Sequence, residues 1–269
     1  MVKKLFKHEF LAWSRIVPLF FLIAPVAALV FRLLELVETD FIIFDLIRGM
    51  TLFSSVIGVI VCIGAPVVFG ITRFYKNLFT GEGYLTFTLP VKTSDQLLVK
   101  IVTAGTFSVC AVIVALFTLL IFLAGEPLET FIFDLRTFLS SLPSEVSMHF
   151  GIYILEALII LIVGLFTSHL QYYSCICLGQ LSRKNRILSA VAAYFLYYVI
   201  TQVLSTLSSL AMLLLAETAL VDAVFQFMDA HPFATIHLSM LFALLICIVF
   251  SGIFYLICHH VIHKKLNLE

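Results

Sequence analysis

The sequence predicts an all-α membrane protein with six transmembrane helices. Hydrophobic residues make up 62% of the chain and charged residues 12%, and the charged share is about half that of an ordinary soluble domain. The mean hydropathy is +1.15. Six apolar segments each approach or exceed the roughly 20 residues that a helix needs to cross a bilayer. Within one predicted domain, 1–269, these spans lie at about 16–37, 47–75, 95–125, 150–182, 187–216 and 235–260.

An amphipathic helix is predicted at residues 3–14, before the first span. On helical spacing, apolar side chains share one side and basic ones the other. The apolar side holds Leu5, Phe6, Phe10 and Trp13, and the basic side holds Lys4, Lys7 and His8. The pattern is typical of a helix that lies in the headgroup plane, basic on its wet face. A plain basic flank of the first span is the alternative.

The second span combines a proline with small residues. Pro66 cannot donate a hydrogen bond to the Cys62 carbonyl, so the sequence predicts a kink. Ser54 and Gly58 belong to a stripe of small residues, which lets another helix approach closely. Helix packing is one interpretation of this stripe, and the wall of a transport path is the other.

A polar segment, 73–100, separates the second and third spans: RFYKNLFTGEGYLTFTLPVKTSDQLLVK. Two glycines bracket Glu82, so a backbone with positive φ is accessible on either side of it. Pro90 disfavours a helical conformation at Leu89. Thr93 with Gln96 three residues later forms a capping box for the next helix. The segment therefore predicts a turn, a short ordered element and a new helix start.

The run GEGYLTFTLPV, followed by the helix start Leu97-Leu98-Val99-Lys100, resembles the first cytoplasmic loop of small permease subunits of type-2 ABC exporters from Gram-positive bacteria. The resemblance implies a multi-pass plasma-membrane protein with a coupling helix that docks on a separate ABC-type ATPase subunit. It also implies a path formed with a second six-span permease, as a homodimer or heterodimer, and a lipophilic or peptide substrate. The expected ATPase contacts are Gly81, Glu82, Gly83, Tyr84, Leu85, Phe87 and Leu89.

Two further helices are expected between spans, on the outside. Apolar residues from Leu128 to Leu139 follow helical spacing, which predicts a surface helix. The segment 217–232 is apolar but too short and acidic to cross, which favours a re-entrant or interfacial helix. A re-entrant segment between spans five and six also resembles the type-2 permeases.

Polar residues inside spans are candidate functional groups because each is costly in lipid unless it faces protein or water. In span five these are Thr201, Gln202, Ser205, Ser208 and Ser209. They predict a self-satisfied packing face, a path lining or a dimer seam. In span four His169 is a buried bundle histidine or a proton site. The spacing of His259, His260 and His263 suits a basic helix end or, alternatively, zinc.

The distribution of charge predicts the orientation. Three cations, Arg32, Arg48 and Arg136, lie on the predicted outer side, and the remaining lysines and arginines fall on the opposite face. Ten acidic residues lie on the outer side. The positive-inside rule therefore predicts that both termini are cytoplasmic.

No phosphate-binding motif G-x-x-x-x-G-K-[ST] occurs in the chain. We therefore expect no enzymatic activity, no catalytic or metal residues and no cofactor in this chain, with ATP bound by the partner. We expect no cleavable signal peptide, no nucleic-acid partner and no disulfide, since the six cysteines fall inside spans. The rival functions are a proton-coupled secondary transporter that uses His169 or Glu156, and a membrane scaffold for a sensor or biosynthetic complex.

Overall fold

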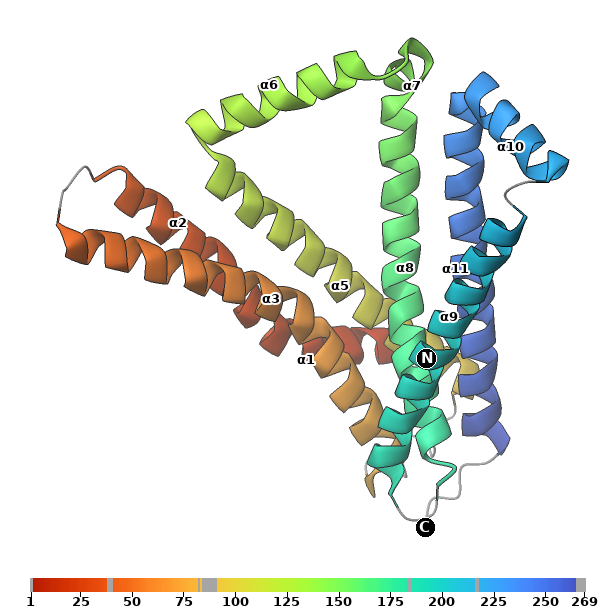
Figure 1. Ribbon diagram of the computed structural model, residues 1–269. Coiled ribbons are helices and arrows are strands. Elements are labelled where there is room, and N and C mark those ends of the chain that lie inside the picture. Colours follow the sequence, from red (N-terminus) through yellow and green to blue (C-terminus); the bar gives the residue numbers. More distant parts are fainter. Residues whose placement is uncertain are drawn as a thin grey trace. The chain divides into compact units, whose positions relative to one another are not determined.

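The computed structural model describes residues 2–37, 41–81, 83, 91–182, 185–215 and 218–264, and these ranges contain helices and no strands (Figure 1). The helices are α1 (Val2–Phe21), α2 (Ile23–Glu35), α3 (Ile42–Phe79), α5 (Thr93–Leu123), α6 (Glu126–Ser141), α7 (Ser144–Met148), α8 (Phe150–Gly179), α9 (Arg186–Leu214), α10 (Ala219–Ala230) and α11 (Pro232–Lys264). Six helical stretches are long and apolar enough to cross a membrane: Val2–Glu35, Ile42–Phe79, Thr93–Leu123, Phe150–Gly179, Arg186–Leu214 and Pro232–His263. The predicted helical class and the six candidate spans are confirmed.

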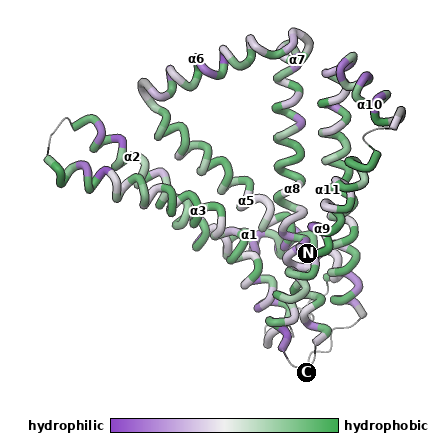
Figure 2. The backbone as a smooth tube through the Cα atoms, in the orientation of Figure 1, coloured by the Kyte–Doolittle hydropathy of each residue, from purple (hydrophilic) through white to green (hydrophobic). Residues whose placement is uncertain are grey.

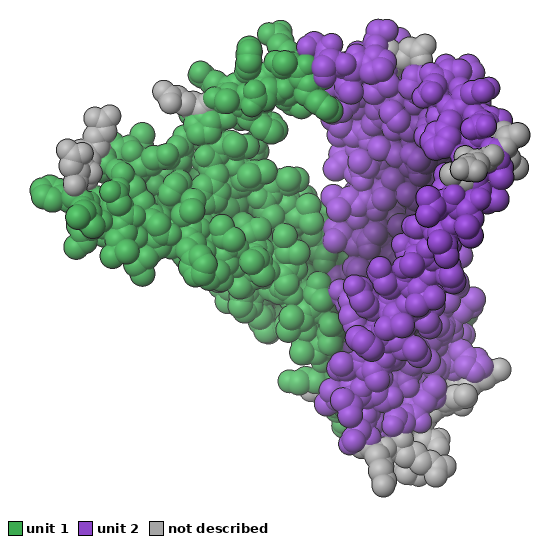
Figure 3. Space-filling model, viewed as in Figure 1, with its two compact units in different colours: residues 1–138 green, residues 139–269 purple. Residues whose placement is uncertain are grey.

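The chain divides into two compact units, residues 1–138 and 139–269 (Figure 3). In the first unit, α1, α2, α3 and α5 pack on one another. In the second, α8 packs along α11 and α9, while α7 and α10 pack on α11. Hydrophobic residues run along most of each long helix (Figure 2), and many of the large ones remain exposed on the protein surface. This is the surface expected of helices surrounded by lipid rather than water.

The amphipathic N-terminal segment is the first part of α1, which continues without a break to Phe21 and stops at Leu22. The predicted boundary between residues 14 and 16 is therefore wrong. Pro25 explains the later position, because its nitrogen has no hydrogen to donate to the Phe21 carbonyl and its ring crowds that carbonyl. The helix resumes as α2, whose Val26 amide donates to the Leu22 carbonyl at 3.2 Å.

Small residues bring α2 and α3 into close contact, as the stripe in the second span predicts. A β-carbon at Gly58 would lie 2.9 Å from the Ala24 Cα atom in α2. One turn earlier in α3, the buried Ser55 hydroxyl donates to the same residue, at 3.4 Å from the Ala24 carbonyl oxygen. One turn further along α3 from Gly58, the Cys62 thiol donates to the Ala111 carbonyl of α5 at 3.6 Å. These contacts join α2, α3 and α5 into one packed unit.

Arg48 fastens the C-terminal end of α2 to the first turns of α3. Its guanidinium donates to the Leu34 carbonyl at 3.2 Å, to the Val37 carbonyl, and to Asp45 at 3.1 Å. These carbonyls lie where a helix runs out of its own amide donors. Arg48 is one of the three cations on the predicted outer side, and these hydrogen bonds give a local structural reason for its position.

In the second unit, α8 is joined to α11 by polar contacts and to α9 by small residues. The Thr167 and Ser251 hydroxyls are 2.9 Å apart across the α8–α11 interface. A β-carbon at Gly179 would lie 2.6 Å from the Ala190 Cβ atom of α9. The predicted surface helix at 128–139 is present as α6, and α10 supplies a helix between the fifth and sixth spans. The re-entrant or interfacial character of α10 stays a prediction.

Candidate functional site

The ends of α3 and α5 border the predicted docking segment. Among the predicted contact residues, Glu82, Tyr84, Leu85, Phe87 and Leu89 lie outside the described residues. Of the two glycines, Gly81 is exposed with open space around its Cα atom, whereas a β-carbon at Gly83 would lie 2.5 Å from the Leu78 carbonyl oxygen. Position 83 therefore requires glycine, because the Leu78 backbone lies too close for a side chain. The packing around position 81 imposes no such requirement.

Neither Gly81 nor Gly83 uses the positive φ that glycine makes accessible. The capping box predicted at the start of α5 is wrong. Thr93 is the first residue of α5 rather than its N-cap, and the N-cap Lys92 makes no side-chain capping hydrogen bond. Gln96 is buried, which places its side chain in the packed interior of the unit instead of in a capping box.

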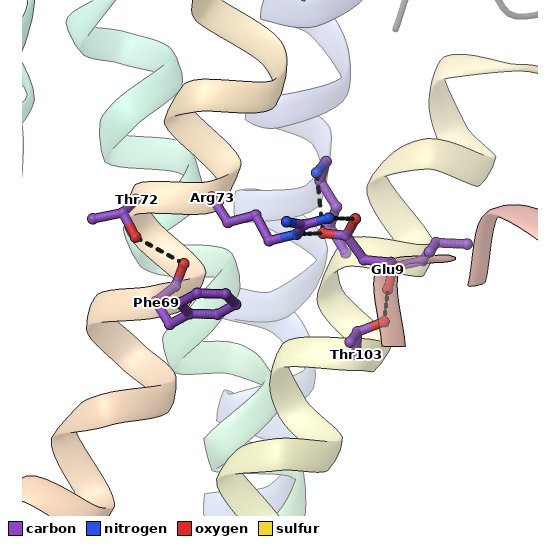
Figure 4. Close-up of polar contacts among 7 residues, drawn as sticks. Glu9, Phe69, Thr72, Arg73 and Thr103 are labelled. Carbon is purple, nitrogen blue, oxygen red and sulfur yellow. Dashed lines mark hydrogen bonds and ion pairs between the residues drawn. The ribbon is translucent and has the colours of Figure 1, made fainter. Parts of the chain in front are cut away.

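A cluster of three charged residues lies on the helices that lead to this segment, and Figure 4 labels two of them, Glu9 and Arg73. Glu9 comes from α1, Arg73 from the last two turns of α3, and Lys100 from the second turn of α5. Both oxygens of the Glu9 carboxylate accept hydrogen bonds from the Arg73 guanidinium, at 2.8 and 2.9 Å. The Lys100 ammonium donates to Glu9 Oε1 at 3.3 Å. One carboxylate thus binds two helices at once, and we refer to Glu9, Arg73 and Lys100 as the ion cluster.

Burial makes the ion cluster sensitive to the loss of any member. Glu9 is 8% exposed and Lys100 is 7% exposed. A buried charge costs several kcal/mol when it is unpaired. The two-pronged contact of Arg73 with Glu9 is the strong geometry for a guanidinium and a carboxylate. Loss of Glu9 or Lys100 would leave a buried charge without this partner, whereas the Arg73 side chain is 26% exposed. The cluster therefore stabilises the contact of α1 with α3 and α5.

Aromatic rings next to the ion cluster fix α1 against the same two helices. Trp13 is 1% exposed. Its ring meets Phe69 of α3 edge-on at 5.0 Å between centroids, and stacks on Phe107 of α5 at 5.2 Å. Phe10 also contacts Phe107, at 5.2 Å. Of the apolar side predicted for the N-terminal helix, Trp13 is buried, Leu5 and Phe6 are half-buried and Phe10 is 37% exposed, while Lys3, Lys4, Lys7 and His8 are exposed.

Glu9 was not among the site residues predicted from the sequence, and no pairing of Arg73 or Lys100 with an acid was predicted. The signal that could have found Glu9 is its spacing, since it precedes the buried Trp13 and Val17 by four and eight residues on one helical face. An acid on the apolar face of an otherwise basic segment predicts a buried cationic partner.

The predicted path or dimer-lining residues belong to two different units of the chain. Gly58 packs against α2 in the first unit, and Ser54 is exposed. Those of α9 belong to the second unit, where Thr201 is half-buried and the others are exposed: Gln202, Ser205, Ser208 and Ser209. Thr201 and Ser209 donate to carbonyls of their own helix, at 3.1 and 3.0 Å. This matches the self-satisfied alternative for these two hydroxyls.

The histidines of the second unit fall into separate groups. His169 is fully buried in α8 beside the rings of Tyr172 and Tyr173. Glu156 of α8 pairs with His237 of α11, which the sequence did not predict. His259 stacks on His263 with 5.8 Å between ring centroids. Among the described residues, no group of three or more His, Cys, Asp or Glu side chains could hold a metal ion.

A scan against protein-family models, a search of curated proteins and a search of solved structures each found no match for this chain. The resemblance of GEGYLTFTLPV to the coupling loop of type-2 ABC permeases therefore stays a prediction, supported by local sequence alone.

Proposed function

We propose that this chain is the permease subunit of an ABC transporter, which forms a translocation path with a second six-span subunit and is driven by a separate ABC-type ATPase. The observation that carries the proposal is the length of the two helices that border the predicted docking segment. α3 has 38 residues and α5 has 31, which correspond to about 57 and 46 Å of helix. The hydrocarbon core is about 30 Å thick.

Both helices are therefore long enough to continue beyond the hydrocarbon core, on the side of the docking segment. Lys76 in the last turn of α3 and Lys92 at the start of α5 are exposed there, as expected for helix ends outside lipid. On the positive-inside rule this side is the cytoplasm. The segment 81–89 would then be held away from the bilayer, within reach of a soluble subunit.

In this mechanism the chain converts motion and performs no chemistry of its own. Closure of the ATPase pair on ATP pushes on the docking segment. The push passes into α3 and α5, which are joined to each other through Cys62 and Ala111 and to α1 through the ion cluster. Tightly packed helices transmit such a displacement because packed interiors deform little. The proposed outcome is rearrangement of the path between two six-span subunits.

A proton-coupled carrier is the second candidate, and one observation favours it. Glu156 and His237 pair across α8 and α11, within two stretches long and apolar enough to cross a membrane. Ionisable residues at such positions often lie on proton or ion pathways. This carrier would need no ATPase partner and would lose activity on Glu156→Gln, while changes in the docking segment would leave it active.

The experiment that tests the proposal is purification of the tagged chain from its native membrane, followed by mass spectrometry of the proteins that accompany it. The ABC-permease proposal predicts an ABC-type ATPase in stoichiometric amount, together with either a second copy or a different six-span chain. A preparation that transports substrate with no ATPase present would contradict the proposal and support the carrier.

A further inference from the structure

We propose that Glu9 is a positioning residue that sets the spacing between the end of α3 and the start of α5. Its carboxylate is the shared acceptor for one cation on each of these helices. α1 thereby acts as a brace across the two helices that border the docking segment. The importance of this spacing for transport rests on the proposed function, whereas the brace itself is a property of the first unit alone.

The positions of the three residues along their helices support this role. Arg73 lies six residues before the last residue of α3, Phe79, and Lys100 lies seven residues after the first residue of α5, Thr93. At 1.5 Å per residue, the ion cluster is about 10 Å from both helix ends. Over so short a length a helix is stiff, so the spacing at the cluster determines the spacing at the ends.

The contact geometry indicates that the two arms of the brace differ in strength. Arg73 holds Glu9 through two short hydrogen bonds, whereas Lys100 makes one longer contact of 3.3 Å to an oxygen that Arg73 already uses. The contact of Glu9 with α3 is therefore the stronger one, and we expect the contact with α5 to break more easily. Trp13 contacts the same two helices, but ring contacts lack the directionality of a two-pronged ion pair.

Distance measurement between paired spin labels tests the brace without any partner protein. Lys76 and Lys92 are exposed and suit replacement by labelled cysteines, in a background in which the six native cysteines are replaced. The purified full-length chain in lipid nanodiscs is predicted to give one narrow distance distribution. Glu9→Gln removes the negative charge while keeping the shape of the side chain, and is predicted to broaden and shift this distribution.

Two further variants separate positioning from general damage. The matched control is Glu35→Gln, which breaks the exposed pair of Glu35 with Arg32 in α2 and is predicted to leave the distribution unchanged. The conservative change Glu9→Asp keeps the negative charge that both cations contact and is predicted to keep much of the narrow distribution. If Glu9→Gln does not fold, Lys100→Met replaces it, since this change removes the contact between α5 and Glu9 and is predicted to broaden the distribution.

An unchanged distribution in Glu9→Gln, or in Lys100→Met where that variant is used, overturns the brace even if an ATPase binds the chain. Broadening in Glu9→Gln, with the narrow distribution largely kept in Glu9→Asp, supports the brace even if no ATPase is found. A binding assay with the ATPase then reports separately on the proposed function. If the brace serves docking, Glu9→Gln weakens ATPase binding and Glu35→Gln does not.

Discussion

Replacement of Gly58 by alanine tests the packing that joins α2 to α3. The added β-carbon would lie 2.9 Å from the Ala24 Cα atom and 3.0 Å from its nitrogen, whereas carbon atoms in contact prefer about 3.5–4.0 Å. Because both neighbours are backbone atoms, α2 must move away by several tenths of an ångström or more. We expect Gly58→Ala to lower the free energy of unfolding by about 1–3 kcal/mol, the usual cost of overpacking.

The matched control is Gly64→Ala on the same helix, where a β-carbon would meet nothing within 4 Å. This variant is predicted to be neutral or more stable by up to about 1 kcal/mol, because alanine loses less conformational freedom than glycine in a helix. The chain has a single tryptophan, Trp13, which is buried in the same unit. Its fluorescence during denaturant titration in detergent micelles therefore reports on this unit. Equal unfolding midpoints for Gly58→Ala and Gly64→Ala would show that the Gly58–Ala24 contact does not limit the packing of α2 on α3.

Three further predictions follow. Single cysteines at Asp134 and Asp222 should react with an impermeant thiol reagent on whole cells, and one at Lys92 only after lysis; labelling of Lys92 from outside would reverse the orientation. The isolated chain should not bind ATP, and saturable binding at micromolar concentration would contradict this. Gly125 has φ 89°, so Gly125→Ala should destabilise the turn between α5 and α6 by about 1–2 kcal/mol, whereas an unchanged unfolding midpoint would show that the turn relaxes without cost.

The helical class and the six spans could be predicted from sequence because they depend on local composition. An apolar stretch of sufficient length forms a helix in lipid whatever its neighbours are, since backbone groups have no other partner there. The stripe at Ser54 and Gly58 likewise predicted close packing, and Gly58 does meet α2. It did not distinguish Ser54, which is exposed, from the adjacent Ser55, which is buried and bonded to α2. A shift of one residue turns a side chain by about 100° around a helix, so only the partner helix determines which serine is inside.

The details that sequence reasoning missed depend on contacts between distant residues. Glu9 and Lys100 are 91 residues apart, and Glu9 and Arg73 are 64 apart. The count of charges placed Arg73 and Lys100 on one side of the membrane, but it could not show that both contact the Glu9 carboxylate. The end of α1 was misplaced for a local reason, since Pro25 disrupts the helix one turn upstream at Phe21. The capping box failed because Gln96 is buried, a tertiary requirement that a local pattern does not contain.

The central claim is that the chain docks on an ATPase through the segment 81–89, and a pull-down of the cognate ATPase tests it most directly. Tyr84→Ala with Leu85→Ala removes two apolar anchors, and such anchors can each contribute about 2 kcal/mol or more to an interface. We expect normal insertion in the membrane, with loss of most ATPase binding and of transport. The control is a double change to alanine at Glu129 and Asp134, both exposed on α6, which is predicted to bind as wild type does. If the docking-segment variant retains its ATPase and its transport activity as fully as the control, the central claim is wrong.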